Sequence, residues 1–169
     1  GDATTGHVPG FTASGFSFGL DDLKPSDEGT ITYNLTNGSN DATVCVMVEE
    51  TGNHDNGVNG PESDAGDTTG GSGGGELGSF LNLDVEGATG TLAALSGTWY
   101  DLGVILGGGT VSSAIDYCFG EIDGSGACVP NDDLSYNLAQ TDSLDADVSF
   151  YAEQTRGNDF SCDNLNDAN

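Results

Sequence analysis

The chain has 169 residues, and its 28 acidic side chains face only two basic ones, Lys24 and Arg156, so its formal net charge at pH 7 is −26. So few cations exclude a protein that binds nucleic acid or docks on an anionic membrane, because both partners are held by clustered Lys and Arg. The charge also opposes close approach of subunits, but at about 1 M salt the Debye length falls to about 3 Å and this repulsion is screened. The composition predicts a halophilic source, or an acidic surface exposed to divalent cations.

The hydrophobic content argues against disorder, the usual alternative for an acidic chain. Hydrophobic residues make up 35% of the chain and the aromatic ones extend from Phe11 to Phe160, which is enough for one core. The 28 glycines, among many Asn, Asp, Ser and Thr residues, indicate frequent turns. We expect an all-β domain over residues 14–169, preceded by an N-terminal arm over residues 1–13 that is too polar for a core and too apolar for a simple tail.

The first part of this domain predicts three strands. Apolar residues alternate with polar or small ones over residues 16–20, 30–35 and 42–48, which is the period-two pattern of half-buried strands. The Asn37–Gly38 pair predicts a hairpin turn between the second and third of these strands.

The second part of the domain predicts further strands. Apolar residues return over residues 77–85, residues 92–106 suit a short helix followed by a buried strand, and residues 111–119 and 134–138 are predicted strands. Near the end, one face of a strand is apolar and is expected to point inward, and the other is expected to point outward: Leu144, Ala146, Val148, Phe150 and Ala152 against Asp145, Asp147, Ser149, Tyr151 and Glu153. Strands at this spacing, with turn signals between them, predict a jelly-roll-like β-sandwich.

Between these two parts, the stretch from residue 50 to residue 75 is almost wholly polar. A structureless loop of this length inside a compact domain is either functional or clamped by local contacts. Its oxygen-bearing side chains make calcium a candidate ligand, although no cofactor is required, and a solvated acidic loop is the alternative. The EF-hand spacing fails, because Gly57 and Gly66 stand at two ligand positions. The candidate ligands are Asp55, Asn59, Glu62, Asp64 and Asp67, with Asn56 and Glu76 as further oxygen donors.

The four cysteines predict two disulfides. Zinc would need short Cys or His spacings, which the sequence lacks. Cys118 and Cys128 flank a Gly-rich segment, so a local bridge between them would close a hairpin, and Cys45 is left to pair with Cys162. The alternative is a set of free buried thiols. Disulfides would place the protein outside the cytoplasm.

Other features also favour export. The chain lacks an initiator Met and an apolar run long enough to span a membrane, so we expect a mature form whose leader has been removed. Asn34 and Asn37 each begin an N-glycosylation sequon, which predicts an extracellular glycoprotein.

The sequence offers little for catalysis, and we expect no enzyme. The only histidines, His7 and His54, have no catalytic neighbourhood, and neither a zinc-protease motif nor a nucleophile elbow with a following His is present. A secreted hydrolase is therefore the weakest of the function classes considered.

Several segments together resemble secreted proteins of the TasA/camelysin family and its archaeal and environmental relatives. The most specific are the Leu-Lys-Pro turn within residues 16–27 and the Gln-Thr-Asp-Ser block at residues 140–143. Shorter matches lie at residues 37–39, 61–77 and 153–162, and Ser26 stands where relatives often carry Gly.

This resemblance implies a jelly-roll subunit of extracellular fibres, of the kind found in biofilm matrix or pili, in which the N-terminal strand of one subunit completes a sheet of its neighbour. Some relatives are described as metallopeptidases, but this chain lacks the ligands for that activity. Donation of a strand is β-augmentation, and a contact of this type does not close on itself, so a filament of identical subunits follows. The donor-strand residues would be Ala3, Thr5, His7, Val8 and Phe11.

We therefore expect a structural subunit of an extracellular filament or pilus, polymerised by donor-strand complementation. The alternative is a monomeric cell-surface module that binds calcium or glycans. Partners of the filament subunit would be identical copies, with neither nucleic acid nor a membrane among them.

Overall fold

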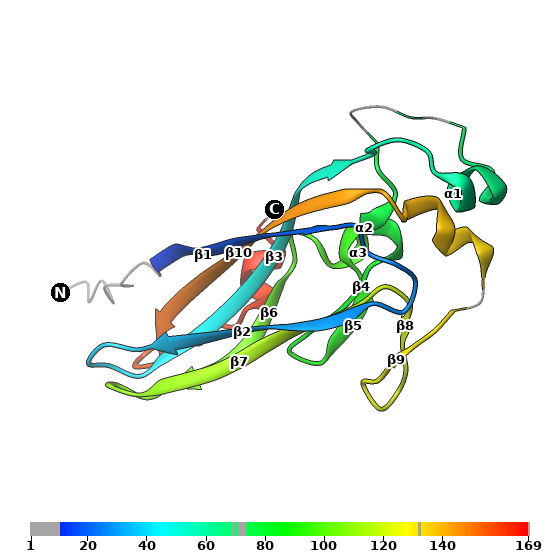
Figure 1. The fold of residues 1–169 in the computed structure, drawn as a ribbon. Coiled ribbons are helices and arrows are strands. Elements are labelled where there is room, and N and C mark those ends of the chain that lie inside the picture. Colours follow the sequence, from blue (N-terminus) through cyan, green and yellow to red (C-terminus); the bar gives the residue numbers. More distant parts are fainter. Residues whose placement is uncertain (1–10, 69, 71–73, 132, 169) are drawn as a thin grey trace.

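The computed structural model describes residues 11–68, 70, 74–131 and 133–168, with only the backbone described for residues 11–14. Within these residues, two four-stranded antiparallel sheets pack face to face (Figure 1). This arrangement confirms the predicted all-β sandwich. The first sheet has the order β1 (Phe11–Asp21), β10 (Ser143–Gln154), β3 (Ala42–His54) and β6 (Trp99–Ile105). The second has the order β2 (Glu28–Thr36), β7 (Thr110–Cys118), β4 (Asn82–Val85) and β5 (Ala88–Thr91).

Short elements connect these strands. A two-stranded hairpin follows β7, and a 3-10 helix precedes β10. Four short helices complete the described part of the chain. These elements are β8 (Glu121–Ile122), β9 (Cys128–Val129), η1 (Leu134–Ala139), α1 (Gly60–Ala65), α2 (Leu77–Phe80), α3 (Leu92–Leu95) and α4 (Asp163–Asn166).

The core lies between the two sheets and follows the predicted alternation. Val46 and Val48 of β3 and Val148 of β10 are buried from one side, and Leu83 and Ile115 are buried from the other. Of the five residues predicted to point inward near the end of the chain, four are buried and Ala152 is partly buried. Burial of the apolar face of each strand is the main stabilising contribution.

The strand register defines two ends of the sandwich. At the arm end, β1 begins, β2 and β10 end, and Phe11 lies opposite Ala152. At the turn end, β1 ends, β2 begins, and Glu28 lies opposite Cys118. Figure 1 shows that these two ends lie at opposite extremes of the long strands.

Three local predictions differ from the structure. Residues 134–138 were expected to form a strand, but they lie in the 3-10 helix η1, where the Asp133 side chain accepts from the Ser135 N–H. The Asn37–Gly38 turn does not close a hairpin, because β2 and β3 belong to different sheets and the chain crosses between them. The first strand already begins at Phe11, so residues 11–13 belong to β1 and not to the arm.

The C-terminal segment covers the outer face of the first sheet. Cys162 is bonded to Cys45 of β3, and the Asn166 side chain exchanges two hydrogen bonds with the backbone of Trp99. Glu153 was expected to point outward, yet it is only 2% exposed and accepts a hydrogen bond from the Asn158 amide of this segment. The predicted parity of the strand is right, but the predicted exposure of Glu153 is wrong.

Candidate functional site

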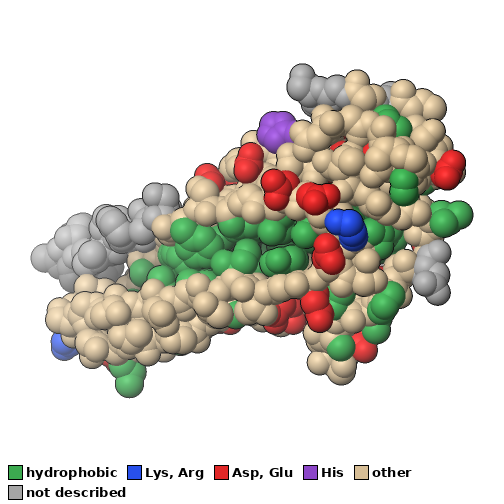
Figure 2. All heavy atoms as spheres, viewed as in Figure 1, with side chains coloured by type: hydrophobic (Ala, Val, Ile, Leu, Met, Phe, Trp, Pro, Cys, Tyr) green, Lys and Arg blue, Asp and Glu red, His purple; other side chains and the backbone are tan. Residues whose placement is uncertain are grey.

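An apolar slot runs between the two edge strands β1 and β2. Figure 2 shows it as a band of hydrophobic side chains, open to solvent, between the two layers of the sandwich. The side chains that pack against the core from these two strands, and that remain partly exposed, are Phe16, Phe18, Leu20, Ile31 and Leu35.

The slot exists because both strands end their sheets on the same side of the molecule. Among the described residues, β1 pairs only with β10 and β2 only with β7. The inward side chains of an edge strand have a neighbouring strand on one side only, so their other flank is left uncovered. The outer backbone groups of β1 and β2 lack a partner strand within the described chain, and such edges readily accept another strand.

Aromatic rings form the inner wall of the slot. The Tyr33 ring of β2 lies 5.2 Å from the Phe150 ring and 6.0 Å from the Phe16 ring, measured between centroids. The Tyr33 hydroxyl donates a 3.0 Å hydrogen bond to Glu86, and burial raises the pKa of Tyr33. These contacts join aromatic rings of the two sheets.

None of the predicted donor residues is seen in this slot: one belongs to β1, and the others are not among the described residues. Phe11 was expected in the donor strand, but it lies in β1 and pairs with Ala152 of its own chain. Ala3, Thr5, His7 and Val8 lie outside the described residues. Their segment directly precedes β1 in the sequence.

The polar stretch after β3 is clamped by local contacts. Asn59 and Glu62 form a capping box at the start of α1, with bonds of 2.9 Å to the Glu62 N–H and 2.6 Å to the Asn59 N–H. The fully buried Glu62 also accepts hydrogen bonds of 2.7 Å from both the N–H and the hydroxyl of Thr141. The part of this stretch around α1 is therefore held by local contacts and by Thr141.

Three of the predicted calcium ligands, Asp55, Glu62 and Asp67, lie close enough to Glu76 or Asp142 to raise the pKa of that group. Asn59 and Glu62 are occupied as caps, Asp64 is exposed, and Asp55 accepts from the Gly57 N–H at 2.8 Å. Asp67 is partly buried and has a partner of its own. Across the described residues, no group of three His, Cys, Asp or Glu side chains has a geometry that could hold a metal ion.

Glu76 and Asp142 form a pair of carboxylates that was not predicted from the sequence. The Glu76 N–H donates to Asp142 Oδ2 at 2.6 Å, and Asp142 is 1% exposed. Burial, and then the neighbouring Asp142, raise the pKa of Glu76 to about 7, and burial also raises the pKa of Asp142. Within the described part of the chain, the buried atoms Glu50 Oε2, Asn53 Oδ1 and Glu76 Oε2 have no hydrogen-bond partner.

The structure forms both predicted disulfides. Cys45 is joined to Cys162 with a Cα–Cα distance of 5.8 Å, and Cys118 to Cys128 with 5.5 Å. The described chain contains no free cysteine. The local bridge fastens the β8–β9 hairpin to the end of β7. The two disulfides together are compatible with an extracellular protein.

The two glycosylation sequons have different surroundings. Asn34 is exposed on the outer face of β2, where its side chain accepts a hydrogen bond from the Ser112 hydroxyl. The Asn37 amide nitrogen donates to the backbone oxygens of Asn40 at 2.6 Å and Ile105 at 2.7 Å. A glycan on Asn37 would remove at least one of these bonds, whereas Asn34 keeps its amide nitrogen available.

No helix in the described part of the chain has the length and apolar character needed to cross a bilayer. Comparisons with protein-family models, with curated proteins and with solved structures found no match.

Proposed function

We propose that this protein is a structural subunit of an extracellular filament of the biofilm-matrix or pilus type. Subunits are joined head to tail by donor-strand complementation, in which the N-terminal segment of one copy lies in the apolar slot of the next. In fold terms, we propose a jelly-roll-like sandwich that lacks one strand until a neighbour supplies it.

The single observation that carries this proposal is the open slot between β1 and β2. An uncovered apolar band on a monomer is unfavourable in water and marks an interaction surface. Here it is bordered by two strand edges, so an added strand gains backbone hydrogen bonds as well as apolar burial. Residues 1–10, if extended at about 3.3 Å per residue, would be about as long as the nine-residue β2.

The charge of the chain constrains where such a filament assembles. Subunits of charge −26 repel one another in dilute buffer, and screening at molar salt removes most of that repulsion. We therefore propose that the filament assembles in a saline medium.

Deletion of residues 1–10 tests the proposal, because β1 begins at Phe11. The truncated chain should fold but remain monomeric in molar salt, while the full chain forms fibres in electron micrographs. A synthetic peptide with the sequence of residues 1–10 should raise the melting temperature of the truncated chain, and a scrambled peptide should not. Fibres formed by the truncated chain would refute the proposal.

The second candidate is a monomeric surface module that binds calcium. The orphaned buried oxygens of Glu50, Asn53 and Glu76 favour it, because unpaired buried oxygens are costly and a hard cation would satisfy them. Calorimetric titration of chelator-treated protein with Ca²⁺ separates the candidates. Binding by a chain that never polymerises would favour the module, and absence of heat at millimolar Ca²⁺ would exclude it.

A further inference from the structure

Arg156 is a cation without an internal role. It is exposed, and within the described chain it takes part in no ion pair or hydrogen bond. The other cation, Lys24, lies 3.8 Å from Asp22 in the turn between β1 and β2. In a chain of charge −26, Arg156 is one of only two positive side chains that could attract the acidic surface of another copy.

The two cations lie at opposite ends of the sandwich. Arg156 follows β10, which ends at Gln154 opposite Ala42, and so stands at the arm end. Lys24 lies in the turn that joins the end of β1 to the start of β2, and so stands at the turn end. Copies stacked head to tail therefore bring Arg156 of one copy, and not Lys24, towards the turn end of the next.

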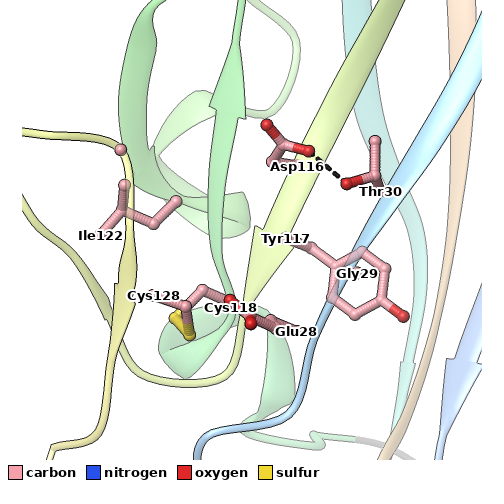
Figure 3. A pocket seen from close by; sticks show the side chains of 9 residues that line it. Glu28, Gly29, Thr30, Asp116, Tyr117, Cys118, Ile122 and Cys128 are labelled. Atoms are coloured by element: carbon pink, nitrogen blue, oxygen red, sulfur yellow. Dashed lines mark hydrogen bonds between the residues drawn. A yellow bond between two sulfur atoms is a disulfide. The ribbon is translucent and has the colours of Figure 1, made fainter.

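An acidic pocket opens at the turn end, on the side of β2 and β7 that faces the β8–β9 hairpin (Figure 3). Its volume is about 360 Å³. Glu28 at the start of β2 and Asp116 near the end of β7 line it, together with Thr30, Ile122 and the Cys118–Cys128 disulfide. Asp116 is oriented by a 2.5 Å hydrogen bond from the Thr30 hydroxyl.

The chemistry of this pocket suits a guanidinium group. Two carboxylates supply acceptors for the five N–H donors of Arg, and the aliphatic Ile122 with the disulfide offers a wall for the apolar stem. Arginine is less strongly hydrated than lysine, so it loses less on entering such a pocket. The hairpin wall is held in place by the covalent bridge between Cys118 and Cys128.

We infer that Arg156 of one copy binds in the Glu28–Asp116 pocket of the next copy along the filament. This inference rests on the proposed function, and it adds a charged contact that is separate from the donated strand. The contact supplies attraction between subunits whose net charges repel, and it favours head-to-tail over head-to-head pairing.

Charge reversal at each cation provides a matched test, because Arg156→Glu and Lys24→Glu change the net charge equally. In molar salt, Arg156→Glu should raise the concentration needed for fibre formation about tenfold, a change of about 1.4 kcal/mol per contact, and Lys24→Glu should have little effect. The double variant Arg156→Glu with Asp116→Arg should restore assembly by exchanging the two charges. Circular dichroism and peptide 1–10 binding confirm that each variant is folded and retains its slot.

The outcomes separate this inference from the proposed function. Equal responses to the two reversals, or failure of the exchanged pair to restore assembly while both chains stay folded, would overturn the Arg156 contact alone. A wild-type chain that never polymerises would overturn the proposed function and this contact together.

Discussion

Glu76 donates its backbone N–H to the carboxylate of Asp142, and burial, together with that neighbouring carboxylate, raises the pKa of the Glu76 side chain to about 7. Neighbouring acids, among them Asp55, add to the effect of burial on both groups. The pair ties the end of the polar stretch to the start of β10 at the expense of placing two acids side by side.

This pair predicts a pH dependence of stability. The folded protein binds a proton at Glu76 more tightly than the unfolded chain, in which the pKa of this group has its ordinary value of 4.5. The free energy of unfolding should therefore decrease as the pH rises from about 4.5 to about 7. Glu76→Gln should flatten this part of the profile and raise the melting temperature at pH 8. An unchanged profile, measured by calorimetry in molar salt, would contradict the buried pair.

The two disulfides should contribute unequally to stability. In the chain-entropy picture, the ten-residue loop closed by Cys118–Cys128 is worth about 3 kcal/mol, and the 117-residue loop closed by Cys45–Cys162 about 5 kcal/mol. Paired Cys→Ser variants, unfolded by urea in molar salt, should follow that order. Non-reducing peptide mapping should recover both linkages, and crossed pairing or free thiols would refute them.

The sequons should differ in use. Mass spectrometry of protein from its native host should find glycan on Asn34 and none on Asn37, whose amide is committed to two backbone oxygens. Asn37→Gln should destabilise the fold by about 1 kcal/mol through loss of these bonds, whereas Asn34→Gln should be nearly neutral. Occupancy of Asn37 in folded protein would contradict the observed geometry.

One parity of the N-terminal segment should control assembly, since side chains of a donated strand alternate between core and solvent. Val8 is its main aliphatic residue, and Pro9 suits the boundary between donated strand and hinge. Val8→Asp should abolish fibres while circular dichroism shows an unchanged fold, and His7→Asp provides the control of opposite parity. Fibres of normal length from Val8→Asp would exclude insertion of this side chain.

Salt should affect both folding and assembly. Dilution of the salt to about 0.01 M extends the Debye length to about 30 Å. Carboxylates up to about that distance apart then repel one another, both within one chain and between neighbouring chains. The melting temperature should fall on dialysis, and divalent cations should restore part of it. A melting temperature indifferent to ionic strength would contradict the inference of a halophilic source.

The sequence predicted the strands with clear alternation, because burial of one face leaves a direct record in the residue pattern. It failed where tertiary contacts decide the outcome. Residues 134–138 carry apolar side chains, but Leu134 is 69% exposed and the Asp133 cap favours a helical turn. Glu153 has the polarity of a surface residue, and only the covering C-terminal segment explains its burial.

The candidate site was predictable only in its parts. The apolar faces of β1 and β2 are visible in the sequence, but their meeting as two open edges depends on which strands pair, and no local pattern encodes that choice. Glu76 and Asp142 are 66 residues apart, so no local sequence pattern could predict their contact. The resemblance suggested a donated strand without indicating where it would lie.

The ladder between β1 and β10 has a mechanical consequence. Their pairing extends from Phe11 opposite Ala152 to Asp21 opposite Ser143, and the proposed donor segment directly precedes β1 in the sequence. Tension applied through that segment would load these hydrogen bonds in shear, all at once, and would not open them one after another. A filament built in this way would resist stretching most strongly along the direction in which its subunits are joined.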